Sequence, residues 1–524
     1  MRRFSYSLLG LLVLLIIFAG SAVLFLPIPF TRDQGIYSYV AWCWVGEWWP
    51  YKFAFEHKGP WLYLIYAIFL QLSRGAMWGP NLADLLSRMS TVALVWVLAR
   101  RMFNSRLAFI AALCTAVPLL CLFSSCWWNG QAETFIMPLA ALATLFAFEA
   151  VKRPTSFGRA LFGIAAGAVL SQMLMVKPSG FWLILGLLIF LRSFSQDKKK
   201  IAILFLLGLF LGLFVWLCYF RFRGIGREFF DEVILFNLFH LEGGGRSATL
   251  LAGRFAGEVW LIFGLSLLLV PAGVFFAFKK NKSPEYFLAL AWLAAALLEL
   301  LLQGRFFFYH LLILIPPCAV ILAIAVAGLT DRRGKVRQGL ALAMILIWAL
   351  SSARIYFLVQ RHYRTLDYLE GKTERGQYYA RFQEPLSGNR RDFNTYATWV
   401  VANWIRERTA PSDYVLVFGY EPGINYLAAR RSPSRFHSDY PLDFPARNKF
   451  GLELRERFRK IFLAELEQRK PKLVVLVHND INALAPIDSY HQAIRFPEFW
   501  DWLLANYRPG ERIEDFEFWW RTGA

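Results

Sequence analysis

Long apolar runs fill the first two thirds of the chain and then stop. Runs of about twenty apolar residues, the length that a helix needs to cross a membrane, recur as far as about residue 358. One further run, Trp61–Leu72, is shorter and is expected to lie at the membrane surface. We interpret eleven runs as transmembrane helices, at 7–27, 82–99, 107–124, 134–150, 160–176, 179–191, 201–220, 257–278, 285–302, 309–329 and 338–358.

The pattern changes after residue 358. From about residue 394, apolar strands alternate with amphipathic helices; the strands are predicted at Tyr414–Phe418 and Leu473–Val477. Helices that alternate with buried strands favour a small parallel α/β sheet. We therefore expect two domains, a transmembrane domain over 1–358 with an external loop at 28–81 and an α/β domain over 359–524.

Composition and charge fit this division. Of the 524 residues, 57% are hydrophobic and only 18% are charged, whereas soluble proteins carry about a quarter charged residues. The net charge of +20 would suggest nucleic acid in a soluble protein. Here the basic residues gather in short loops between spans, so membrane topology explains the charge and no nucleic-acid partner is expected.

The distribution of these basic residues predicts the orientation. With the eleven spans above, one side of the membrane receives nineteen basic residues in short loops, and the other receives eleven over far more sequence. Because positive residues stay in the cytoplasm, we expect a multi-pass protein of the cell membrane with a cytoplasmic N-terminus and an extracytoplasmic C-terminal domain. Of the six cysteines, Cys43 and Cys126 fall in loops on the outer side and are candidates for a disulfide, whereas most of the others fall in apolar runs.

Candidate chemistry begins directly after the first span, in Thr31-Arg32-Asp33-Gln34-Gly35-Ile36-Tyr37. A carboxylate this close to the membrane boundary is costly unless paired, so Asp33 is either functional or a solvated interfacial group. Further along the same loop, Glu56, His57 and Lys58 are consecutive. A carboxylate with an imidazole can hold a divalent metal ion, and a lysine suits a phosphate.

This arrangement resembles the GT-C glycosyltransferases, in particular the superfamily of protein O-mannosyltransferases and the aminoarabinose (lipid A) transferase. The shared pattern is Asp-x-Gly-x-Tyr after the first span, then Pro-Tyr, Phe-Glu-His-Lys and an amphipathic helix. The resemblance implies a catalytic role for Asp33 and a second acid at Glu133, where relatives often carry aspartate. His57 takes the place of a glutamate in the aminoarabinose transferase, which leaves open whether Glu56 or His57 faces the site.

Later basic residues extend the resemblance. Lys177 interrupts an apolar region, and the stretch from Arg305 to His310 resembles the family's segment ahead of Leu-Pro-Pro, here Ile315-Pro316-Pro317. With Lys58, these residues are expected to bind the phosphate of a lipid donor. The alternatives are snorkelling of Lys177 and Arg305 to the interface and a purely structural His310.

The expected fold class is therefore a polytopic α-helical membrane protein of GT-C type, with about eleven transmembrane helices, juxtamembrane helices and a C-terminal extracytoplasmic α/β domain. The expected activity is inverting transfer of a sugar from a polyprenyl-phosphate donor to a hydroxyl of an acceptor glycan, lipid or protein outside the cytoplasm. A divalent metal ion at Asp33, Glu56 and His57 is possible.

Two alternatives to an enzyme are kept. A transporter or flippase for a lipid-linked substrate predicts polar residues at mid-membrane depth. A non-catalytic scaffold of the same fold predicts that Asp33, Glu133 and Lys177 lie far apart.

Two further segments carry weaker patterns. Acids alternate with bulky apolar residues over Glu228–Asn237, which predicts a surface helix that gates or covers the site. His478-Asn479-Asp480 follows a predicted strand, and we expect it to be a solvent-exposed loop.

Overall fold

The structure, a computed structural model, is divided by its contacts into two compact units. The membrane unit comprises Met1–Leu26, Asn81–Tyr219 and Arg246–Tyr363, and the α/β unit comprises Pro27–Pro80, Phe220–Gly245 and Arg364–Ala524. The predicted domain boundary at residue 358 stays a prediction. The structure describes residues 2–123, 129–242, 248–264, 268–304, 306–330, 339, 343, 363–382, 385–386, 390–391, 394–481 and 485–523.

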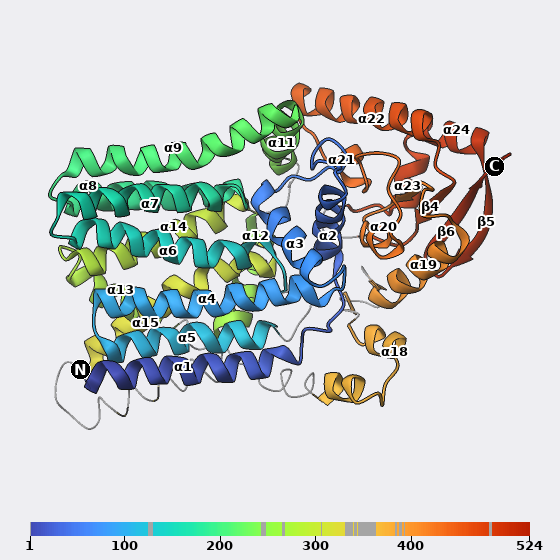
Figure 1. Cartoon of the computed structure of the whole chain (residues 1–524). Helices are drawn as coiled ribbons and strands as arrows, with labels where there is room; N and C mark the ends of the chain where they lie inside the picture. The colour runs from blue at the N-terminus through green and yellow to red at the C-terminus, as the bar shows by residue number, and fades with distance from the viewer. Residues whose placement is uncertain are drawn as a thin grey trace. The chain divides into compact units, whose positions relative to one another are not determined.

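The membrane unit is built of long apolar helices that run alongside one another (Figure 1). Within the described ranges, eight helices are long and apolar enough to cross a membrane, and they correspond to eight of the eleven predicted spans in full or nearly so. The elements of this unit are α1 (Arg2–Val23), α4 (Trp78–Met102), α5 (Ser105–Phe123), α6 (Ala132–Lys152), α7 (Ser156–Leu174), η2 (Pro178–Gly180), α8 (Phe181–Phe194), α9 (Lys198–Arg223), α12 (Ala248–Phe263), α13 (Val270–Lys279), α14 (Pro284–Gln303), η5 (Phe308–Leu314) and α15 (Ile315–Thr330).

The predicted span 257–278 is wrong as a single helix. Helix α12 ends at Phe263, and Gly264 then has a left-handed φ of 50°. A new helix, α13, begins at Val270 with Pro271 in its first turn, where the missing N–H of proline costs nothing. The predicted span 179–191 corresponds to the shorter apolar helix Pro178–Phe194. The predicted span 338–358 lies outside the described residues except for 339 and 343.

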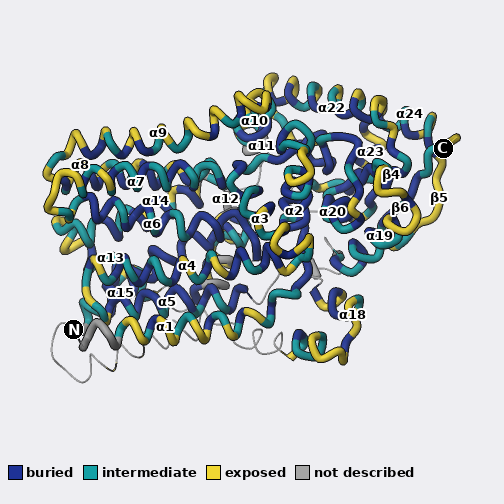
Figure 2. Tube along the Cα trace, viewed as in Figure 1, coloured by how far each residue is buried: buried dark blue, intermediate teal, exposed yellow. Residues whose placement is uncertain are grey.

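Small residues let two of these helices approach closely. A Cβ added at Gly167 of α7 would lie 1.9 Å from the carbonyl oxygen of Phe205 on α9, and one added at Gly208 would lie 2.0 Å from that of Ile164. Close packing of this kind holds helices together in lipid, where the hydrophobic effect does not drive helices to associate. Side chains such as Phe210 and Val215 of α9 remain exposed, and Figure 2 shows exposed residues along much of this helix, as expected of a surface that meets lipid.

The α/β unit centres on a four-stranded sheet with the order β3-β4-β6-β5. The strands are β3 (Val415–Phe418), β4 (Leu473–Val477), β5 (Tyr507–Ile513) and β6 (Phe516–Arg521). The predicted strands are confirmed, and β3 is parallel to β4, with Val415 opposite Leu473. The sheet is nevertheless mixed, because β6 pairs antiparallel with both β4 and β5.

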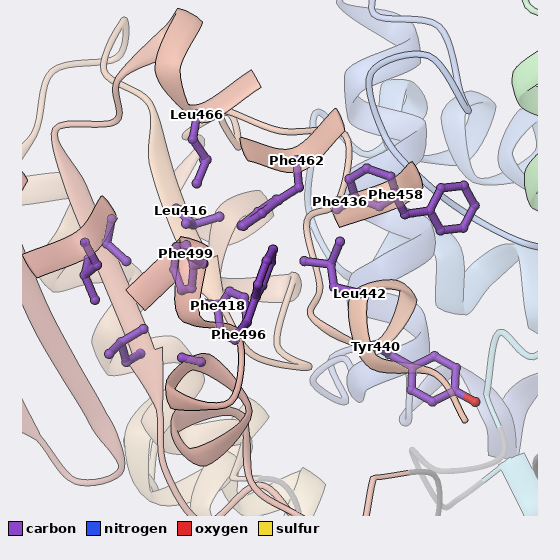
Figure 3. Close-up of a cluster of buried hydrophobic side chains, with 14 of the residues drawn as sticks. Leu416, Phe418, Phe436, Tyr440, Leu442, Phe458, Phe462, Leu466, Phe496 and Phe499 are labelled. Carbon is purple, nitrogen blue, oxygen red and sulfur yellow. The ribbon is translucent and has the colours of Figure 1, made fainter. Parts of the chain in front are cut away.

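Alternate residues of the central strands face two different cores. Val417 and Val475 pack on one face with residues of α19 (Thr395–Arg408) and α20 (Gly423–Ala428). Leu416 and Phe418 pack on the other face with α22 (Lys449–Arg469) and α24 (Pro497–Asn506), where the rings of Phe418 and Phe499 stack with centroids 4.6 Å apart (Figure 3). Burial on both faces explains the uninterrupted apolar runs of these strands.

The remaining described elements of this unit are short. The predicted surface helix is confirmed as a helix: α3 spans Pro60–Leu72, and its thirteen residues make it too short to cross a bilayer. The segment Glu228–Asn237 is helical as predicted but irregular, with a π-helical turn in the middle. The elements are α2 (Arg32–Val45), α3, α10 (Gly226–Phe229), η3 (Phe230–Leu235), α11 (Phe236–Glu242), α18 (Arg375–Ala380), β1 (Pro385–Leu386), β2 (Arg390–Arg391), α21 (Tyr440–Asp443) and α23 (Ser489–Ile494).

Candidate functional site

In the membrane unit, Lys177 is the centre of a buried polar cluster. Its ammonium group donates to Glu133 Oε1 at 2.5 Å and to Gln303 Oε1 at 2.8 Å. Glu133 lies in the first turn of α6, and Gln303 is the last residue of α14. The side chain of Lys177 is 13% exposed and that of Glu133 is 1% exposed. Two residues predicted from the sequence, Lys177 and Glu133, are therefore direct partners.

Two more groups complete this cluster. His310 is buried, and its Nε2 lies 3.8 Å from the same Glu133 oxygen. Glu299, one turn before Gln303, is buried as well and accepts a hydrogen bond of 2.9 Å from Ser179 Oγ. The sequence analysis missed Glu299, although a lone acid within a predicted span is itself a signal of function.

The cluster suits a small anion. An ammonium has three N–H groups, and within the described part of the chain Glu133 and Gln303 accept from two of them. The surroundings are apolar, so an ionic hydrogen bond is much stronger there than in water. Glu133 pairs with this ammonium, and a phosphate oxygen is the kind of additional acceptor that the ammonium would attract.

In the α/β unit, Asp33 lies in the first turn of α2, where the positive end of the helix favours a carboxylate. The backbone N–H of Thr31 donates to Gln34 Oε1 at 3.0 Å, and this capping box fixes the turn around Asp33. Burial, together with the charges of Asp33 and Glu56, raises the pKa of Tyr420. The phenol of Tyr420 thus lies within electrostatic reach of both predicted carboxylates.

The residues Glu56, His57 and Lys58 form a chain of contacts. His57 Nδ1 lies 2.9 Å from Glu56 Oε1, and Lys58 Nζ lies 2.7 Å from His57 Nε2. Burial alone would raise the pKa of Glu56, but the charges of His57 and Lys58 and two hydrogen bonds from His57 lower it to about 2. Glu56 is buried, whereas His57 and Lys58 are half-buried. The exposed edge of this trio therefore belongs to His57 and Lys58.

This arrangement does not fit the predicted metal ion. Both ring nitrogens of His57 are already engaged, Nδ1 with Glu56 and Nε2 with Lys58, which leaves no lone pair for a ligand bond. Within the described part of the chain, no three His, Cys, Asp or Glu side chains are grouped so as to hold a metal ion. Asp33, Glu56 and His57 therefore do not form a metal site in this conformation.

His478-Asn479-Asp480 is a loop as predicted and Asn479 is exposed, but the predicted exposure is wrong for Asp480. Asp480 is buried, and Ser489 Oγ lies 2.5 Å from its Oδ2 and 2.7 Å from Oδ2 of the buried Asp439. Burial, followed by the charge of Asp480, raises the pKa of Asp439. Asp439 precedes Asp480 by a long stretch of sequence, so no local pattern indicated this pair. His478 contacts Glu517 at 2.8 Å.

Two predicted residues cannot be placed. Arg305, predicted to bind phosphate, and Cys126, the proposed partner of Cys43, lie outside the described residues.

The chain is similar to known proteins in part of its sequence and in its fold. Residues 57–219 match the family of dolichyl-phosphate-mannose-protein mannosyltransferase. The structure is similar to ArnT from Cupriavidus metallidurans bound to undecaprenyl phosphate, with a TM-score of 0.59 and 10% identity over 99% of this chain and 98% of that one. A search of curated proteins finds no match at the sequence level.

A second similar structure is the archaeal oligosaccharyltransferase AglB from Archaeoglobus fulgidus in complex with an inhibitory peptide and a dolichol-phosphate. It matches with a TM-score of 0.53 and 14% identity over 89% of this chain and 69% of that one. Another structure of the same archaeal enzyme is a complex with Zn and sulfate, with a TM-score of 0.51 and 15% identity over 88% of this chain and 68% of that one. The resemblance predicted from the sequence is confirmed: the chain is a multi-pass membrane protein of the GT-C fold that matches, over residues 57–219, the dolichyl-phosphate-mannose-protein mannosyltransferase family.

Proposed function

We propose that this protein is a membrane glycosyltransferase that moves a sugar from a polyprenyl-phosphate donor to an acceptor hydroxyl on the extracytoplasmic side. The observation that carries the proposal is the ammonium of Lys177, held by Glu133 and Gln303 among apolar helices. An ionisable group in such surroundings is costly and is usually retained for function. The lipid phosphates bound by ArnT and AglB support a phosphate as its ligand.

Lys177 would stabilise the leaving group. When the bond between the anomeric carbon and the phosphate oxygen breaks, its electron pair stays on the phosphate, and negative charge grows there. A preorganised ammonium in a water-poor site stabilises that charge more than water does. His310 and Lys58, with Arg305, would provide further donors to the same phosphate.

Asp33 would act on the acceptor. The acceptor oxygen attacks the anomeric carbon from the face opposite the phosphate, which inverts the configuration of the sugar. Its proton passes to the carboxylate of Asp33, in the first turn of α2. The products are the glycosylated acceptor and the polyprenyl phosphate. Glu133 would hold the ammonium of Lys177 in position throughout the cycle.

The test measures transfer and lipid binding separately. The purified chain is reconstituted with a panel of synthetic polyprenyl-phosphate sugars, and release of polyprenyl phosphate is followed. We expect Asp33→Asn to reduce turnover at least about 100-fold but to keep its affinity for polyprenyl phosphate, since general base catalysis contributes that much. Lys177→Met should lose both.

The controls keep folding and rival functions apart. Asp501→Asn changes an exposed carboxylate of the α/β unit and should leave turnover unchanged. Thermal unfolding of each variant reports whether it folds. Unchanged turnover of Asp33→Asn would refute the assignment. Movement of a lipid-linked substrate across proteoliposomes without any sugar transfer would favour the transporter instead.

A further inference from the structure

A cavity of about 870 Å³ lies in the α/β unit, and its lining residues differ from the candidate site residues described above. One face of α19 provides much of its wall, with side chains spaced as on a helix surface at Trp399, Asn403, Trp404 and Glu407. The other walls come from the end of α2, the segment after α3, α18 and α20. The remaining lining residues are Trp42, Gly75, Met77, Arg375, Tyr379, Val400, Arg406, Arg408, Tyr426, Leu427 and Ala429.

We propose that this cavity binds a saccharide that carries a negative charge, and that this saccharide is part of the acceptor. The inference rests on the proposed function only where it calls this saccharide the acceptor; the predicted binding does not depend on that function. The volume is in the range of small-molecule sites and is large enough for a short oligosaccharide. The chemical class of the ligand follows from the residues that line the cavity.

Tryptophan rings provide the surface on which a sugar would stack. Trp42, Trp399 and Trp404 line the cavity and are each half-buried, so part of each indole is accessible there. The stacking surface is assigned to Trp42 and Trp399, because the ring of Trp404 already carries the guanidinium of Arg408, 4.6 Å from its centroid. The C–H groups on one face of a pyranose are weakly positive and pack against the negative face of an aromatic ring. Trp404 is held in place by Phe518, whose ring stacks on it with centroids 4.0 Å apart. A cavity wall fixed in this way loses little side-chain freedom when a ligand binds.

The charged residues select an anion. Three guanidinium groups, those of Arg375, Arg406 and Arg408, line the cavity, against the single carboxylate of Glu407. Arg406 Nη2 already donates to Asn403 at 2.7 Å, which orients that guanidinium. Arg408 lies 3.5 Å from Glu407 in an exposed pair, which water weakens. A planar guanidinium matches a carboxylate or a phosphate in bidentate geometry, so the sugar would carry one of these groups.

The position of the cavity near Asp33 indicates that its ligand is part of the acceptor. A second cavity, of about 20 Å³ and thus large enough for one water, shares Met77, Tyr379, Trp399 and Leu427 with the first. Its other walls include Arg32 and Gly35, on either side of the proposed base Asp33. A saccharide bound on Trp399 would therefore be next to the turn that carries Asp33.

Binding is measured with the full chain in nanodiscs. The probes are an oligosaccharide of hexuronic acids, the same oligosaccharide with its carboxylates reduced to alcohols, a phosphorylated oligosaccharide, an acidic glycolipid and inorganic phosphate. We expect an acidic saccharide to bind at least about tenfold more tightly than the reduced one, since one lost ionic contact is worth about 1.4 kcal/mol. Preference between the soluble and the lipid-borne acidic saccharide identifies the source of the acceptor.

Variants separate the cavity from the catalytic step. Trp399→Ala and Arg406→Gln should each weaken acidic saccharide binding about tenfold, and Trp399→Phe should restore most of it because a ring remains. Asp33→Asn should bind the saccharide like the unchanged chain, so binding can succeed even where transfer fails. Arg512→Gln, a change at an exposed arginine that does not line the cavity, should have no effect.

Three results would overturn the inference. One is the absence of binding by every acidic saccharide at millimolar concentration. Another is equal binding by inorganic phosphate, which would show that charge alone is recognised. The third is unchanged affinity in a well-folded Trp399→Ala variant. If Asp33→Asn abolished transfer while one of these results was found, the proposed function would stand and only the acceptor cavity would fall.

Discussion

The two units differ in how they bury charged side chains. In the membrane unit, Lys177 is paired with Glu133, and the fully buried Arg88 is paired with Asp84 at 2.9 Å. The α/β unit also buries opposite charges, as in Arg32 and Glu421 at 3.3 Å. In addition, it buries carboxyl groups side by side, as in Asp439 and Asp480 on the hydroxyl of Ser489.

This difference follows from what each group can do when it leaves water. A carboxyl group in the α/β unit can avoid the cost of burial by keeping its proton, which is why burial raises the pKa of Glu232 as well as of Asp439. An arginine cannot release its proton at all, so burial in an apolar helical unit requires an opposite charge. The comparison therefore predicts different responses to mutation and to pH.

The largest effect is expected in the membrane unit. Glu133→Leu removes the partner of Lys177 and leaves an ammonium buried, which should lower the free energy of unfolding by about 3–5 kcal/mol. The double variant with Lys177→Leu should regain most of this loss, because no unpaired charge remains. Denaturant titration in mixed micelles measures both variants.

A second ion pair in the membrane unit provides the control for the removal of a glutamate. Lys152 and Glu285 form a contact of 2.6 Å with side chains 43% and 18% exposed. Glu285→Leu should therefore cost less than about 1 kcal/mol, as is usual of ion pairs that water reaches. A single Glu133→Leu variant as stable as the double variant would contradict the pairing argument.

A smaller and pH-dependent effect is expected in the α/β unit. The pKa of Asp439 is raised to about 7 by burial and by Asp480, against 3.8 as its ordinary value. Its folded form therefore holds a proton that the unfolded chain releases, and this stabilisation is full below pH 3.8 and is lost as the pH rises toward 7. Asp439→Asn keeps a neutral side chain at every pH.

The Asp439→Asn variant should therefore become more stable relative to the wild type as the pH rises. We expect its advantage in the free energy of unfolding to be smallest at about pH 4 and to grow until the pH passes about 7, where the folded carboxyl group of the wild type also loses its proton. Melting temperatures measured across this range provide the test. A difference between the two proteins that stays constant with pH would mean that the carboxyl pair does not share a proton.

The sequence predicted features that depend on local pattern. The length of apolar runs located most spans, and a polar interruption indicated Lys177. The family resemblance indicated Glu133, which contacts Lys177 in the structure. The sequence did not predict that Gln303 and Ser179 join them, because polar residues at the ends of apolar helices are common and only the fold selects those that meet. The break at Gly264 was missed because the residues on both sides are apolar.

In the α/β unit, too, the sequence predicted local features and missed those that depend on residues far apart in the chain. Its two inner strands are buried on both faces and were recognisable as apolar runs. The hairpin β5–β6 was missed because β5 is an edge strand that is mostly exposed and contains Pro509 and Gly510. The pair of Asp439 and Asp480 was out of reach, because it depends on residues far apart in the chain that only folding unites.

The smallest predicted effect concerns packing near Asp33 and involves no charge. Gly35 is the glycine of the Asp-x-Gly-x-Tyr pattern, and a Cβ added there would lie 2.9 Å from the Cα of Gly423 on α20. The neighbour is backbone and cannot rotate away, so Gly35→Ala must separate the two helices, at a cost of about 1–3 kcal/mol. Alanine stabilises a helix by up to about 1 kcal/mol relative to glycine. The expected net decrease in the free energy of unfolding is therefore about 1 kcal/mol.

Gly20→Ala in α1 provides the control for this prediction, because nothing lies within 4 Å of the added carbon. It should leave the protein as stable as before or slightly more stable, since only the gain in helix propensity remains. If Gly35→Ala behaved in the same way, α2 and α20 would not be in close contact. If it lost about 1 kcal/mol and also lowered turnover, the glycine of the motif would serve to position the first turn of α2, and with it Asp33, against the rest of the α/β unit.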